Sequence, residues 1–220
     1  MKKTLVKMII GILFFALQAT HTANAQGTVT FNAPWIDNGI AYFSLRQFDG
    51  MSFRVNPYPP QPHDDVMHVG ATGPSGYPHN GTPYLGFSNT LGIPQFVVFA
   101  WTNAASTGQS FLDGAPFGLV SVDLADPLAP SLSPVSITFN GFRADGSMVS
   151  ETFTTPGNGA TTFETYSFGP DFAWGLTRVE IPSPVWAMDN IMYVPEPGAG
   201  SLFLLGLLTL GWRAAQGRRS

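Results

Sequence analysis

Short alternations of apolar and polar residues run through the middle of the chain, and they predict β-strands. In residues 135–139, valine, isoleucine and phenylalanine alternate with serine and threonine, which is the two-residue period of a strand with one buried face. No stretch between residues 26 and 193 has the 3.6-residue apolar stripe of an amphipathic helix. The pattern therefore predicts an all-β domain.

Two Asp-Gly pairs indicate where neighbouring strands turn back. Asp49-Gly50 separates residues 41–48 from residues 51–55, and Asp145-Gly146 precedes residues 148–153. Such a pair suits a type I′ turn, in which both central residues need positive φ. We therefore predict a β-hairpin at each pair.

Further strand signals follow at short intervals, separated by glycine, proline, asparagine and aspartate. They cover residues 29–31, 84–87, 96–101, 117–123, 136–142, 162–168, 175–181 and 186–193. Many short strands in one domain of this length predict a two-sheet sandwich, here of the jelly-roll type. We place this β-sandwich ectodomain at residues 26–193.

Residues 57–83 differ from the rest of the domain. They hold seven of the 19 prolines and all three histidines that follow residue 25. Because proline lacks an N–H donor, we predict a long Pro/Gly-rich surface loop that supplies no central strand. Replacing residues 64–79 with a short linker is then expected to cost no more than about 1 kcal/mol.

The chain begins like an exported protein. Three lysines within the first seven residues precede the apolar residues 8–17, and the small residues Ala23 and Ala25 come just before Gln26. This order predicts a secretory signal peptide at residues 1–25, cleaved before Gln26 after export by the Sec machinery.

The chain ends with three features in order. The triplet Pro195-Glu196-Pro197 is followed by 15 residues, 198–212, that carry no charge, and then by Arg213, Arg218 and Arg219. A helix through the uncharged run spans about 22 Å, against about 30 Å for a bilayer core, which favours a transient membrane helix. The arginines are expected on the cytoplasmic side, so the triplet faces outward from the inner membrane.

These three features resemble the PEP-CTERM sorting signal of Gram-negative bacteria, here residues 194–220. The resemblance implies that an exosortase recognises the Pro-Glu-Pro motif and removes the tail. It implies an inner-membrane intermediate and then release to the cell surface or extracellular matrix. The alternative is an ordinary tail anchor with a proline-rich stalk.

A second resemblance concerns the domain. Its last predicted strand, with Trp186 and then Asp189-Asn190-Ile191, is similar to the end of the β-sandwich ectodomains of PEP-CTERM proteins, which look like carbohydrate-binding jelly rolls. This likeness implies a sandwich fold and leaves function open.

Charge narrows the choice of partners. Residues 26–197 contain no lysine, four arginines and 14 carboxylates, which gives a formal net charge of −10. Nucleic acid and anionic lipid surfaces are therefore poor partners, and divalent cations are better ones. The chain has no cysteine, which excludes disulfides, a thiol nucleophile and a cysteine zinc site.

Two groups of residues could ligate a metal. One loop carries imidazole and carboxylate groups at His63, Asp64, Asp65, His68 and His79, which suits a transition metal or simply a solvated loop. Asp189-Asn190, with Asp37 or Asn38, could offer oxygen ligands to calcium, or could cap neighbouring backbone groups. We assign no cofactor and no metal site, and calcium remains the cation to test.

Aromatic side chains offer another kind of site. Tryptophan and tyrosine rings can stack on sugars or fill a core, and the residues concerned are Trp35, Trp101, Trp174, Tyr58, Tyr77 and Tyr84. There is no G-x-S-x-G elbow, and no spacing selects a pair of catalytic carboxylates. We therefore expect a non-catalytic surface protein that associates with extracellular polysaccharide. The alternative is a secreted hydrolase acting on polysaccharide.

Overall fold

A computed structural model describes residues 26–31, 40–43, 45–56, 67–70, 78, 80–88, 96–101, 115–126, 133–157 and 162–196. Over these ranges the fold is nearly all β, with antiparallel pairing throughout and one 3₁₀ turn, η1 (Pro170–Phe172). The strands are β1 (Gly27–Val29), β2 (Ile40–Phe43), β3 (Leu45–Phe48), β4 (Met51–Asn56), β5 (Met67–Gly70), β6 (Tyr84–Ser88), β7 (Phe96–Trp101), β8 (Phe117–Ala125), β9 (Ser136–Arg143), β10 (Met148–Thr154), β11 (Glu164–Ser167), β12 (Leu176–Ile181) and β13 (Val185–Pro195).

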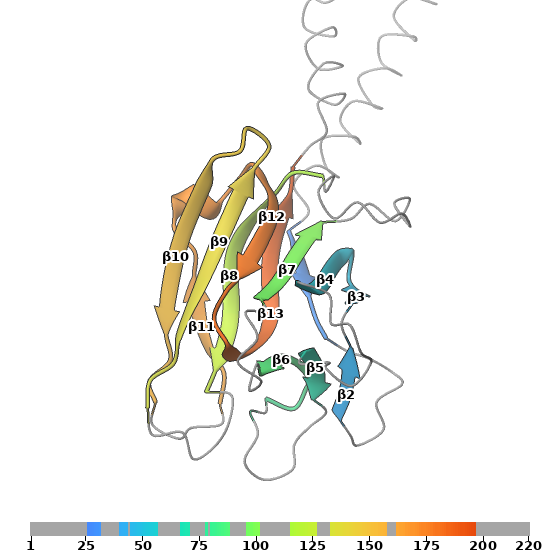
Figure 1. The fold of residues 1–220 in the computed structure, drawn as a ribbon, viewed down its shortest axis with the longest axis vertical. Helices are drawn as coiled ribbons and strands as arrows, with labels where there is room; N and C mark the ends of the chain where they lie inside the picture. The colour runs from blue at the N-terminus through green and yellow to red at the C-terminus, as the bar shows by residue number, and fades with distance from the viewer. Residues whose placement is uncertain are drawn as a thin grey trace, which may run out of the picture.

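The pairings form two runs of neighbouring strands. One run is β10-β9-β12-β7-β4-β3, and the other is β2-β5-β6-β13-β8-β11. β1 pairs with the second half of β13, on the side where β6 pairs with its first half. The two runs join where Leu176 of β12 pairs with Phe117 of β8. Figure 1 shows the long strands side by side, with β2, β5 and β6 gathered at the lower end.

The hydrophobic core takes side chains from both runs. The ring of Phe99 in β7 lies 6.5 Å from that of Phe117 in β8. Phe31, just after β1, meets Phe53 of β4 with ring centroids 5.5 Å apart. All four rings are fully buried. The alternation predicted for residues 135–139 is confirmed, because Ile137 and Phe139 are buried while serine and threonine lie outward.

Both predicted hairpins are present, but their turns differ. Asp49 and Gly50 have φ of 45° and 84°, as a type I′ turn requires. At the second hairpin only Gly146 has positive φ, and its N–H donates to Arg143 O at 3.0 Å. The type I′ prediction is therefore wrong there. Ala144 lengthens the loop, and the Asp145 carboxylate accepts the Ser147 N–H instead.

The prediction that residues 57–83 hold no central strand is also wrong. β5 lies inside this segment, between β2 and β6, and Met67 and Val69 are fully buried. Physically, residues 67–70 contain no proline and alternate apolar with other residues. The prolines that break secondary structure lie on either side of this strand.

Several strand boundaries also differ from the predicted ones. The single strand expected at residues 41–48 is two strands, β2 and β3, and the last strand extends beyond residue 193 to Pro195. Within the described ranges, no helix has the length and apolar character needed to cross a bilayer.

Candidate functional site

The last described residues, Pro195 and Glu196, are bound to the domain and form what we call its docked end. Pro195 is the final residue of β13 and pairs with Phe117 of β8. The Glu196 N–H donates to Pro116 O at 3.1 Å, and the Glu196 carboxylate accepts the Gly175 N–H. The Pro-Glu-Pro triplet therefore begins within the last strand of the folded domain. Pro197, Arg213, Arg218 and Arg219 lie outside the described residues.

Two glycines allow this arrangement. Gly175 has φ of +76°, a conformation that L side chains rarely adopt. A Cβ on Gly118 would lie 1.9 Å from the carbonyl oxygen of Ala173. The turn after η1 can therefore lie directly on β8, beside the strand that carries Val194. That position brings the Gly175 N–H to the Glu196 carboxylate.

An exposed tryptophan lies next to this docked end. Trp174 precedes Gly175 and is 62% exposed. The Arg143 guanidinium carbon lies 5.3 Å from the Trp174 ring centroid, and Arg143 Nη2 donates to Asp171 O at 2.7 Å. The arginine thus supports an accessible indole through a cation–π contact.

The other predicted sugar-binding rings behave differently. Tyr84 is buried, and Trp101 packs on Tyr193 with ring centroids 4.7 Å apart. For these two side chains the core interpretation fits. Trp35, Tyr58 and Tyr77 lie outside the described residues.

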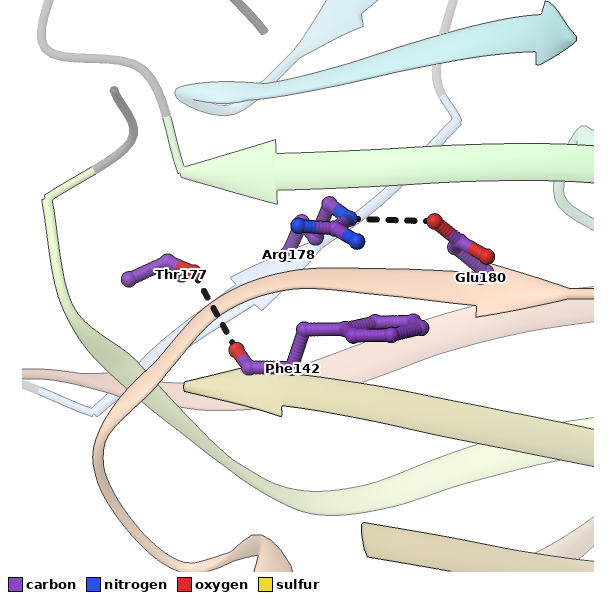
Figure 2. A network of polar contacts seen from close by, with 4 residues as sticks. All are labelled: Phe142, Thr177, Arg178 and Glu180. Carbon is purple, nitrogen blue, oxygen red and sulfur yellow. Dashed lines mark hydrogen bonds and ion pairs between the residues drawn. The ribbon is translucent and has the colours of Figure 1, made fainter. Parts of the chain in front are cut away.

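A polar network covers part of the outer face between β9 and β12 (Figure 2). The Arg178 guanidinium stacks on the Phe142 ring, 3.9 Å from its centroid, and its Nε lies 3.0 Å from Glu180 Oε1. Thr177 Oγ1 donates to Phe142 O at 3.1 Å. Sequence reasoning missed this group. The Arg-x-Glu spacing on a predicted strand was an available signal, because residues two apart share one face.

The same face continues onto β10 as a row of paired polar side chains. Ser150 Oγ donates to Asn140 Oδ1 at 2.8 Å, and the hydroxyls of Thr138 and Thr152 lie 2.9 Å apart. Met148 pairs with Phe142 at the end nearest Arg143 and is 56% exposed. Because the polar side chains bond to one another, they fit cross-strand stabilisation of the sheet.

A buried carboxylate organises the opposite part of the domain. Asp189 Oδ2 accepts Asn80 Nδ2 at 2.8 Å and Thr82 Oγ1 at 2.9 Å, and Oδ1 accepts the Asn190 N–H at 2.8 Å. Burial raises the pKa of Asp189, and these hydrogen bonds oppose that shift. The facing Asp123 accepts Asn190 Nδ2 at 2.8 Å. Asp189 therefore links residues 80–82 to the last strand.

The predicted metal ligands are not assembled among the residues that the structure describes. No group of three or more histidine, aspartate or glutamate side chains there could hold an ion. The backbone capping by Asp189 matches the alternative interpretation of Asp189-Asn190. His63, Asp64, Asp65, His79, Asp37 and Asn38 lie outside the described residues. The calcium expectation stays a prediction.

The predicted signal-cleavage site borders the first strand. Gln26 directly precedes β1, whose Gly27 pairs with Tyr193 of β13. Cleavage before Gln26 would thus leave β1 complete. Ala23 and Ala25 are not among the described residues.

Comparison with known proteins gives distant matches only. No family model and no curated protein matches the chain. Among solved structures, the chain is similar to the CBM22-1 and GH10 modules of endo-1,4-beta-D-xylanase 10B from Clostridium thermocellum, complexed with xylohexaose. This match has 13% identity and a TM-score of 0.40, over 77% of this chain and 28% of that one. An exo-beta-agarase matches with 10% identity and a TM-score of 0.35, over 79% and 25%. The chain thus spans about a quarter of these proteins.

Proposed function

We propose that this is an exported cell-surface or extracellular-matrix protein of a Gram-negative bacterium, sorted by exosortase processing of residues 194–220. Residues 1–25 direct it through the Sec machinery, and residues 198–212 hold it transiently in the inner membrane. The supporting observation is that β13 ends at Pro195, within the motif. All the described strands thus end before the expected cleavage point near Pro197, and removal of the tail beyond that point leaves them intact.

We propose a two-sheet sandwich of the jelly-roll type for the ectodomain. Two features support this finer description. The strand pairings fall into two runs joined by one bridged pair, Leu176 with Phe117. Rings from the two runs pack on each other, as in the contact between Phe99 and Phe117. A sandwich places its core between two such faces.

The sorting proposal is tested in a host that has an exosortase. Mass spectrometry of protein from the envelope and medium should find a wild-type C-terminus near Pro197. Glu196→Ala should leave the full-length precursor in the membrane, because recognition loses its carboxylate. Replacement of Arg213, Arg218 and Arg219 together should also block processing, because the short helix loses its cytoplasmic stop.

Glu164→Ala is the matched control, since it removes an exposed glutamate that pairs with the opposite end of β8 from Pro195. It should be processed like the wild type. An intact Ser220 on the mature surface protein of the wild type would make the tail a plain anchor.

We further propose that the ectodomain is non-catalytic and associates with extracellular polysaccharide through Trp174. This ring is the exposed member of the described aromatic candidates, and an accessible indole can stack on the apolar face of a sugar. The processed protein should be retained on at least one polysaccharide of an array. Trp174→Ala should reduce that retention about tenfold, because a lost ring contact of about 1.5 kcal/mol corresponds to about one order of magnitude in affinity.

Met148→Ala is the control for this test, because it removes a similarly exposed but non-aromatic side chain from the same end of the sheet. Retention should be unchanged. A steady release of reducing ends from the retained polysaccharide would favour the alternative, a secreted polysaccharide-acting hydrolase.

A further inference from the structure

We propose that the folded domain holds the sorting motif in a closed latch, so that Glu196 must leave Gly175 before the processing enzyme can bind it. The motif latch consists of Pro116, Phe117 and Gly175 on the domain side, and Pro195-Glu196 on the motif side. This inference rests on the proposed function, because it concerns regulation of the same motif.

Three contacts on two consecutive residues make the latch. Pro195 is held in the strand ladder opposite Phe117. The Glu196 N–H donates a hydrogen bond to Pro116 O, and the Glu196 carboxylate accepts one from the Gly175 N–H. A backbone N–H bonded to a carboxylate is a charge-assisted bond, which is stronger than a neutral one.

The latch withholds the groups that recognition needs. An enzyme that binds an extended segment uses its backbone N–H groups and its side chains. In the latched form, the Glu196 N–H and one carboxylate oxygen already have partners in the domain. The apparent affinity of the enzyme for the precursor then falls with the fraction of released motif.

The domain side can be weakened without any change in the motif. Gly175 has φ of +76°, and an added Cβ there would meet Arg143 Cδ at an ordinary 3.5 Å. In Gly175→Ala, the positive φ therefore becomes unfavourable, although the new Cβ causes no clash. This disfavours the backbone orientation in which the N–H of residue 175 points at Glu196. Gly81→Ala is the matched control, since its φ is +93° and open space surrounds it.

The first measurement is hydrogen exchange of the full-length precursor in detergent, read by mass spectrometry. The Glu196 amide should be protected in the wild type. Gly175→Ala should speed its exchange about fivefold, and Gly81→Ala should leave it unchanged. An unprotected Glu196 amide in the wild type overturns the latch, whether or not the host processes the protein.

The second measurement is the rate of precursor processing in the exosortase-bearing host, followed by pulse-chase. Gly175→Ala should be processed about fivefold faster than wild type. A Gly-Ser-Gly-Ser insertion between Val194 and Pro195 should also accelerate processing, since it moves the motif away from Gly175 with the domain unaltered. Processing of the wild type with no acceleration in either variant overturns the latch. A wild type that is never processed overturns the proposed function instead.

Discussion

Met67→Ala is expected to destabilise the domain by about 3 kcal/mol, because it opens a cavity in the core. Met67 begins β5, lies opposite Phe87 of β6 and is fully buried. Alanine removes three heavy atoms from a cluster that takes side chains from both runs of strands. The measurement is urea unfolding followed by circular dichroism, with the midpoint compared at constant slope.

Met148→Ala makes the same change at an exposed position, where little packing is lost. We expect its free energy of unfolding to lie within about 0.5 kcal/mol of the wild type. Equal effects of the two substitutions would mean that residues 67–70 form a surface segment after all.

The same burial reverses the expectation for the proline-rich segment. Replacement of residues 64–79 by a short linker would remove β5, a strand between β2 and β6. The small loss of stability that loop closure predicts holds only for a segment without buried side chains, and Met67 and Val69 are buried. The prediction for residues 57–83 was based on the average proline content of 27 residues. It therefore missed the strand pattern of the four residues 67–70, which contain no proline.

Local patterns predicted most of the described strands because their signals are short-range. Alternation marked β9, and Asp49-Gly50 marked a hairpin whose turn has the expected positive φ at both residues. The second hairpin was found with the wrong turn, since the choice of turn depends on whether Ala144 belongs to the loop. Strand existence was therefore easier to predict than turn geometry.

Contacts between distant segments could not be predicted in this way. Asn80 and Thr82 bind Asp189 across more than 100 residues, and no local pattern pairs them. The Pro-Glu-Pro triplet is visible in the sequence alone, whereas the contact of Glu196 with Gly175 depends on how η1 and β8 pack. Sequence thus predicts which residues form the motif, and the tertiary structure determines the contacts that hold it.

Gly118→Ala is expected to destabilise the domain by about 3 kcal/mol or more, through overpacking rather than a cavity. The new Cβ would lie 1.9 Å from Ala173 O and 2.4 Å from Ala173 C, both backbone atoms that no rotamer change can move. The turn that carries Gly175 must therefore shift away from β8. A fall of roughly 8 °C in melting temperature corresponds to this loss.

Gly169→Ala is the matched control, since its φ is −70° and the nearest atom to an added Cβ is 3.6 Å away. Its melting temperature should stay the same or rise slightly, because alanine reduces the entropy of the unfolded chain. If the two variants had the same melting temperature, the turn after η1 would not lie on β8. The contact between Gly175 and Glu196 would then lose its structural basis.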